Sequence, residues 1–349
     1  MLRRSRFSSV RQFSLVLATT LGLAVVAVGQ AVAVMVVAPA SSATARAAAE
    51  PSASTTPWAI AIYPNLAAAA DPATSATPVP STFSVYAAPA TGPMLLPGAT
   101  RVIRFDGPAG SAPAQAEWNG DLGSGGNTEL ETYTASAANS YLDGNGHLVI
   151  VARRQALTGP DGMTRAFTSA RLSTANKVAV QPGSYVEASI TAPTGVGVRS
   201  VFSTVGIVNG PPSGPRAGGL DILVCTGATP TLAHSAVHMA SLSDPGVDNL
   251  WGWGRPGGTT DLGSPLDAGP HFYGVYFDAQ VVRFYVDRKL TMQITAAQAA
   301  ASDRSWPFAG PQYLTLNIAV DSEATVTTSF PRTMTVGPIG VYSKVPFQS

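Results

Sequence analysis

Residues 142–153 read LDGNGHLVIVAR, a tight turn followed directly by a strand. Asp143 and the two glycines beside Asn145 are the residue types that most readily reverse the chain direction. From His147 to Ala152 the run is rich in β-branched and apolar side chains, which favour extended backbone. The segment therefore predicts a strand that enters a sheet immediately after a turn.

The same pattern of strands and turns continues from about Arg101 to the end of the sequence. Short apolar runs alternate with turns rich in Gly, Pro, Asn and Asp, and Phe277–Gln280 is expected to form a hairpin loop. Only Ala296–Ser302 has helical character. Closely spaced strands over so long a segment predict an all-β fold, a two-sheet antiparallel β-sandwich of the jelly-roll type. Further strands are expected at residues 184–190, 273–277, 281–286 and 314–320.

Charged residues make up only 12% of the chain, and the basic ones are unevenly placed. Five of the 21 Lys and Arg residues precede the first acidic residue, Glu50. The rest of the chain has 16 basic and 20 acidic side chains, and therefore a net charge of about −4. Because no basic stripe is left to neutralise phosphates, a nucleic-acid partner is not expected. The five early residues are Arg3, Arg4, Arg6, Arg11 and Arg46.

The first 40 residues predict a signal peptide or membrane anchor. Arginines before residue 12 form a positive region, and Leu15–Ala38 is almost wholly apolar and is followed by small residues that suit a signal peptidase. The apolar run is long for a cleaved signal and nearly long enough to span a bilayer, so an uncleaved anchor remains an alternative. Membrane contact is expected only through this segment. The folded part is expected outside the cytoplasm, either secreted or in the cell envelope.

Residues 41–98 are rich in Ala, Pro, Ser and Thr and carry few charges. Such a composition buries too little apolar surface to offset chain entropy, which predicts a disordered tether. The folded domain is accordingly placed at 99–349 and is expected to be a monomer. The single cysteine, Cys225, cannot form an internal disulfide, and it follows the apolar run Ile222–Val224, which indicates a buried thiol.

Several segments between residues 102 and 343 carry motifs that occur together, in this order, in one family of enzymes. Asn127–Thr134 reads NTELETYT, close to N-x-E-L-Q-x-Y-T, and residues 142–153 are close to DGNGHLVITAR. Phe167–Leu172 is close to YTSARL, and residues 271–277 with 283–287 follow the pattern H-x-Y-x-V-E-W…R-F-Y-V-D. By these motifs the chain resembles glycoside hydrolase family 16, the laminarinase-like enzymes with a concanavalin A-like jelly roll.

The resemblance implies a catalytic strand of the pattern Glu-Ile-Asp-Ile-Met-Glu. A bulge in that strand lets the two outer glutamates and the middle aspartate share one face, where one glutamate attacks the sugar and the other protonates the leaving oxygen. The matching run is Gly219–Val224, GLDILV. Gly219 stands at the nucleophile position and Val224 at the acid position. Asp221 alone is retained, and it is the only candidate catalytic residue in the run.

Neither lost glutamate can be recovered by shifting the register, because no glutamate occurs between Glu187 and Glu323. The sugar-stacking wall is altered as well, since Arg199 and Ser203 stand where the family has two tryptophans. A protein without nucleophile and acid loses most of its chemical rate enhancement. The sequence therefore predicts a catalytically impaired or inactive protein.

The resemblance also indicates side chains that contact substrate. His234 and His238 match a histidine-bearing strand of the family, but no third ligand is near them, so no metal site is predicted. No cofactor is expected, and a structural calcium ion, which some relatives carry, stays open. Asp221 and Glu129 have a purely structural alternative as hydrogen-bond partners, and the two tryptophans an alternative as cover for the core edge. The substrate-binding candidates are His238, Asn127 and Glu129 from the resemblance, and Trp251 and Trp253, in the stretch LWGWG, as candidates for the rim of a groove.

Three hypotheses about function follow. The first is a non-catalytic protein on a hydrolase scaffold that binds β-glucan or another polysaccharide of the cell envelope. The second is an active endo-β-glucanase with atypical carboxylates, Asp221 together with Glu129 or Asp248. The third is a structural or interaction module that binds no sugar. Fold alone does not decide among them.

Overall fold

The computed structural model describes residues 95–125, 128–208, 214–254 and 257–347. The predicted signal peptide or anchor at 1–40 and all but the last four residues of the predicted tether lie outside the described residues, as does Asn127. Across these four described segments, no helix is both long and apolar enough to span a membrane.

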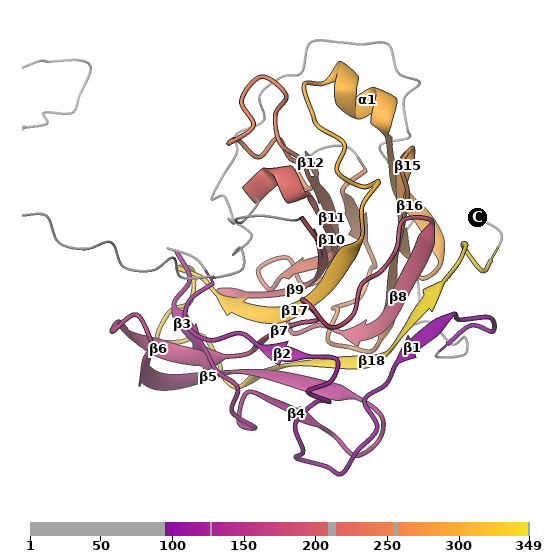
Figure 1. Cartoon of the computed structure of the whole chain (residues 1–349). Coiled ribbons are helices and arrows are strands. Elements are labelled where there is room, and N and C mark those ends of the chain that lie inside the picture. Colours follow the sequence, from indigo (N-terminus) through magenta and orange to yellow (C-terminus); the bar gives the residue numbers. More distant parts are fainter. Residues whose placement is uncertain (1–94, 126–127, 209–213, 255–256, 348–349) are drawn as a thin grey trace, which may run out of the picture. The chain divides into compact units, whose positions relative to one another are not determined.

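Two sheets build the described domain and confirm the predicted β-sandwich (Figure 1). Their strand pairs are antiparallel except β3 with β6. Among the described residues, the ten-stranded sheet has the order β16 (Lys289–Thr295), β15 (Val281–Val286), β14 (His271–Phe277), β8 (Ser184–Thr191), β18 (Arg332–Tyr342), β5 (Leu148–Thr158), β6 (Thr164–Ser169) and β3 (Glu131–Tyr133), with β1 (Arg101–Ile103) beside β18 and β4 (Ser140–Leu142) beside β5. The eight-stranded sheet has the order β12 (Trp251–Gly252), β11 (Leu232–His238), β10 (Gly219–Thr226), β9 (Val198–Gly206), β17 (Gln312–Val320), β7 (Arg171–Ser173) and β2 (Asn119–Gly120), with β13 (Thr259–Asp261) beside β11.

The turn before β5 forms as the sequence predicts. Asp143 Oδ1 accepts hydrogen bonds from the backbone N–H groups of Asn145 and His147, at 2.7 and 3.0 Å. The two glycines beside Asn145 have φ angles of +82° and +88°, which a residue without a side chain adopts at little cost. The turn joins β4 to β5 as an antiparallel pair, with Leu142 opposite Leu148.

The other two local predictions are confirmed as well. The expected helix forms as α1 (Ala296–Ala301), where Thr295 is the N-cap and Gln298 completes a capping box. The expected hairpin loop at Phe277–Gln280 joins β14 to β15. Asp278 Oδ1 stabilises this loop by accepting two backbone hydrogen bonds, at 2.7 and 2.8 Å. A short 3₁₀ helix, η1 (Gly214–Ala217), precedes β10.

The core lies between the two sheets, where β10 faces β14 and β17 faces β5. Phe202 from β9 and Leu223 from β10 are fully buried there, together with Ile150 and Val275 from the ten-stranded sheet. Cys225 is buried among them as a free thiol, as predicted, and burial raises its pKa to about 12. Dispersion contacts and apolar burial therefore stabilise the core between the two sheets, and Cys225 contributes no disulfide to it.

Side chains alternate along a strand, so the residues between these core positions point away from the core. We call this side of the eight-stranded sheet the outer face. Cross-strand pairing places its members next to one another in rows. They are His234, Ala236 and His238 on β11, Gly219, Asp221 and Val224 on β10, Arg199, Val201 and Ser203 on β9, and Thr315 and Asn317 on β17.

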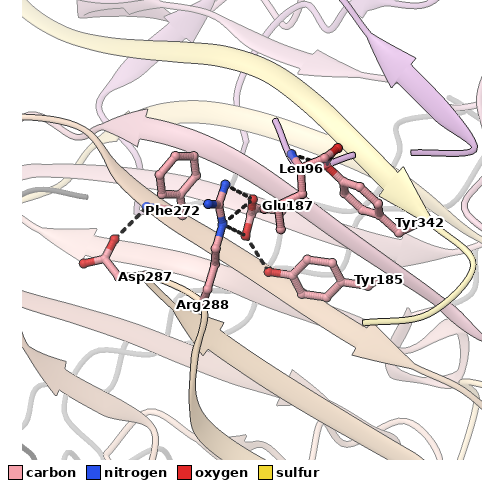
Figure 2. Close-up of polar contacts among 7 residues, drawn as sticks. All are labelled: Leu96, Tyr185, Glu187, Phe272, Asp287, Arg288 and Tyr342. Atoms are coloured by element: carbon pink, nitrogen blue, oxygen red, sulfur yellow. Dashed lines mark hydrogen bonds and ion pairs between the residues drawn. The ribbon is translucent and has the colours of Figure 1, made fainter. Parts of the chain in front are cut away.

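The far side of the ten-stranded sheet carries a buried ion pair (Figure 2). Glu187 is 2% exposed and accepts hydrogen bonds from Arg288 Nε and Nη2, at 3.2 and 3.0 Å, and from Tyr185 Oη at 2.7 Å. The first and last segments of the described domain meet beside this pair. Leu96, within the last residues assigned to the tether, donates its backbone N–H to Tyr342 Oη at 3.0 Å.

Candidate functional site

The site is organised by a bulge in β10. Asp221 pairs with Ser203 of β9, whereas Leu223 pairs with the next residue along, Phe202, so Ile222 is the extra residue. The shift places Gly219, Asp221 and Val224 together on the outer face. This is the arrangement that the motif predicts for the nucleophile, middle and acid positions.

Two of these three positions carry no ionisable group. Gly219 has no side chain, and a Cβ atom added there would lie 3.1 Å from the Thr204 carbonyl oxygen and 3.8 Å from the His238 ring. Val224 is 2% exposed and apolar. A hydrogen atom and an isopropyl group can neither form a glycosyl ester nor transfer a proton.

Asp221 belongs to a largely buried chain of charges. Its Oδ2 lies 3.0 Å from His238 Nε2, and Asp248 Oδ2, from the loop between β11 and β12, lies 2.6 Å from His238 Nδ1. Burial lowers the pKa of His238, but the charges and hydrogen bonds of Asp221 and Asp248 outweigh this effect and raise it to about 10. His238 is therefore an imidazolium at neutral pH, held between two carboxylates.

The wall beside this triad is formed by Trp253. Its ring stacks on His234, with centroids 5.0 Å apart and planes 24° apart, and Arg199 Cζ lies 5.7 Å from the same ring. Arg199 also pairs with Asp321, at 3.4 Å between Nη2 and Oδ2. Burial, aided by the charge of Arg199, lowers the pKa of His234 to about 4, so this histidine is neutral at pH 7.

The β17 end of the outer face carries a second polar centre. Asn317 Nδ2 donates to Tyr133 Oη at 3.1 Å, and Tyr133 Oη lies 3.5 Å from Glu129 Oε2. Glu131 is fully buried on β3, and its Oε2 accepts the backbone N–H of Val320 at 2.7 Å. Sequence reasoning named Glu129 but missed Glu131. Its only local indication was a glutamate, at the start of β3, where the family pattern has glutamine.

The middle of the outer face is closed to solvent. Ser203 and Thr315 are 0% and 1% exposed, and their hydroxyls bond each other at 2.6 Å. Asp221 is 3% exposed. The groups that remain partly exposed lie to either side, namely Glu129, Arg199, His238 and Trp253.

The predicted site residues therefore do not form a single cluster. Asp221 and His238 are brought together, Glu129 lies at the β17 end, and Trp253 stands over His234. Trp251 packs against the core, with Arg304 Cζ 5.1 Å from its ring. Asn127 lies outside the described residues.

Comparison with known proteins places these features in context. No family model matches the chain. It is 29% identical over 219 residues to a beta-glucanase of Rhodothermus marinus, spanning 60% of this chain and 71% of that protein. Among solved structures, an endo-beta-1,3-glucanase from Pyrococcus furiosus is 30% identical with a TM-score of 0.60, covering 70% of this chain and 93% of the other. The laminarinase catalytic domain of Thermotoga maritima is 26% identical with a TM-score of 0.61, covering 70% and 97%.

Proposed function

Because this chain belongs to glycoside hydrolase family 16, the laminarinase-like enzymes, we propose that it is an exported protein that binds β-glucan or a related cell-envelope glycan without hydrolysing it. The observation that carries the proposal is the register of β10. Its bulge directs Gly219, Asp221 and Val224 to one face, and only Asp221 has a carboxylate. Retaining hydrolysis needs one carboxylate to attack and a second to protonate the leaving oxygen.

An active glucanase would have to use replacement carboxylates, and Asp248 is the candidate that shares a hydrogen-bond partner with Asp221. Asp221 and Asp248 each bond a different nitrogen of His238, so a charged imidazole ring fills the space between them. In a retaining enzyme the two carboxyl groups stand about 5–5.5 Å apart with the sugar between them. This arrangement favours binding over hydrolysis.

A module without sugar binding is the remaining alternative. The closed middle of the outer face supports it, whereas the partly exposed groups beside it support recognition of a glycan. Trp253 offers an indole ring, and Glu129 and Arg199 offer hydrogen-bonding groups for hydroxyls. We therefore place binding on the flanks of the outer face.

Laminarin, a β-glucan, is the first probe. Purified protein is incubated with laminarin, reducing ends are counted, and binding is measured by calorimetry. We expect reducing ends at the level of the buffer and a measurable affinity. Trp253→Ala is expected to weaken binding by about tenfold, the typical effect of removing an aromatic anchor. Trp306→Phe, beside the core residue Phe308, serves as the matched control and is expected to leave the affinity unchanged.

Two results would contradict the proposal. Reducing ends far above the blank that disappear in Asp221→Ala would establish hydrolysis. A folded protein that binds no β-glucan on a glycan array would favour the module without sugar binding. Export is tested separately by fractionating cells, where the protein is expected outside the cytoplasm.

A further inference from the structure

Arg199 is a largely buried arginine whose guanidinium has few hydrogen-bond partners. Its side chain is 13% exposed, and within the described segments its only ion pair is with Asp321, at 3.4 Å between Nη2 and Oδ2. Its Nε is buried and donates to no acceptor in the part of the chain that the structure describes. A guanidinium carries five N–H donors in a rigid fork, so most of them are unused. Because buried polar groups are ordinarily hydrogen-bonded, these donors indicate an acceptor that comes from outside the protein.

Strand register places this guanidinium in the predicted sugar-stacking wall. Arg199 pairs with Thr226 of β10 and with Ala319 of β17, and its side chain lies on the outer face. Its Cζ lies 5.7 Å from the ring of Trp253, which is partly exposed. An indole ring for the apolar face of a sugar and a set of donors for its hydroxyls therefore lie next to each other. The family motif has tryptophan at position 199, so these donors are a property of this chain.

The charges around Arg199 indicate which kind of acceptor fits. Asp321 already places a carboxylate 3.4 Å from Nη2. Burial lowers the pKa of Arg199, whereas the negative charges of Asp321 and Glu129 raise it, and those of Glu323 and Asp221 act in the same direction. A carboxylate or sulfate on a ligand would add one more negative charge to this set. A neutral acceptor adds none, so hydroxyl oxygens fit this position better than an anionic group.

We propose that Arg199 is a specificity-determining residue that selects glycans with two free hydroxyl groups on neighbouring ring carbons. The inference rests on the proposed function for glycan binding itself. Two such hydroxyls present two acceptors side by side, which a planar fork of N–H groups can meet together. In a β-1,4-linked glucan each ring keeps O2 and O3 free on adjacent carbons. In a β-1,3-linked chain O3 is used by the linkage and separates O2 from O4, so Arg199 favours β-1,4-linked runs.

The test compares β-1,4-linked cello-oligosaccharides with β-1,3-linked laminari-oligosaccharides of the same length. Their affinities for the full chain are measured by calorimetry. The wild type is expected to bind the β-1,4-linked form about tenfold more tightly, the worth of one hydrogen bond to a charged group. Arg199→Lys keeps the charge but loses the fork, so its preference is expected to fall below about twofold. Arg165→Lys, in the Arg165–Asp161 pair beside the β5–β6 turn, is the matched control and should keep the wild-type preference.

Several outcomes would overturn the inference. Equal wild-type affinity for the two oligosaccharides would do so while leaving the proposed function intact, and this comparison requires no variant to fold. A preference that survives Arg199→Lys would assign the selection to another residue. Cello-oligosaccharides oxidised to uronic acids keep both hydroxyls and add a carboxylate. Weaker binding of this form is expected, and tighter binding would show that the acceptor is anionic. If the wild type binds neither oligosaccharide nor laminarin, the proposed function fails and the inference fails with it.

Discussion

Gly219 and Val224 show how the surroundings adapt to the loss of two charged side chains. The space beside Gly219 is bounded by the Thr204 carbonyl oxygen and the His238 ring, and Val224 is almost fully buried. Asp221, which would neighbour a glutamate in the family pattern, bonds the His238 imidazolium instead. The retained aspartate is thus balanced by a neighbouring cation.

Restoring both glutamates is therefore expected not to restore hydrolysis. The double variant Gly219→Glu/Val224→Glu forces a Cβ atom against a carbonyl oxygen and buries a carboxylate in an apolar position. We expect the free energy of unfolding in urea to fall by roughly 2–4 kcal/mol and reducing-end release to stay at the blank. Release from laminarin that vanishes when Asp221→Asn is added would contradict this expectation and reveal a cleft that still accepts sugar.

At the scale of elements, the sequence predicted what local chemistry controls. The turn at Asp143, the hairpin at Phe277–Gln280 and the capped helix α1 all depend on neighbouring residues, and all three form. β5 extends to Thr158, beyond the predicted end at Ala152. The sequence did not predict this outer half, because it is exposed and has no apolar pattern. The parallel pairing of β3 with β6 depends on tertiary contacts, for which a single sequence carries no local indication.

The contact between β8 and the turn after β15 gives a prediction at this scale (Figure 2). Arg288 lies at φ +64° in that turn and packs its guanidinium 4.0 Å from the Phe272 ring while it pairs with Glu187. Arg288→Met leaves a buried carboxylate unpaired, so we expect the free energy of unfolding to drop by roughly 3–5 kcal/mol. Adding Glu187→Gln is expected to recover most of the loss, because the amide oxygen can still accept the Tyr185 hydroxyl.

Urea unfolding of the single and double variants measures both effects. Arg283→Met, which removes an exposed partner of Gln293 on the neighbouring strand, is the matched control and should change the free energy by less than about 0.5 kcal/mol. Equal losses in Arg288→Met and in the double variant would argue against an electrostatic origin.

At the scale of the whole molecule, the candidate site was only partly predictable. Asp221 and His238 could be named from motif positions, because each sits on a framework strand of the family pattern. Their partner Asp248 comes from a loop, and sequence reasoning named it only as a replacement carboxylate. Glu131 was missed because its significance depends on burial and on its hydrogen bond from the Val320 backbone, and neither property can be seen along the chain.

The two outer-face histidines together set the pH range over which the whole molecule is most stable. His238 has a folded-state pKa of about 10, above the ordinary 6.5, so its contribution is complete below pH 6.5 and is lost as the pH rises towards 10. His234 has a folded-state pKa of about 4, so its contribution is complete above pH 6.5 and is lost as the pH falls towards 4. The losses are on the order of 5 kcal/mol for His238 and 3 kcal/mol for His234.

Stability is therefore expected to decline on both sides of about pH 6.5, the ordinary histidine pKa. Urea unfolding from pH 4 to pH 10 measures the profile. Compared with the wild type, His238→Gln should flatten the alkaline side, because Asp221 and Asp248 then have no imidazolium to lose. His234→Gln should flatten the acid side, because no buried ring is then forced to accept a proton beside Arg199. An alkaline decline of equal size in His238→Gln and the wild type would show that the charge held between the two aspartates does not govern this side of the profile.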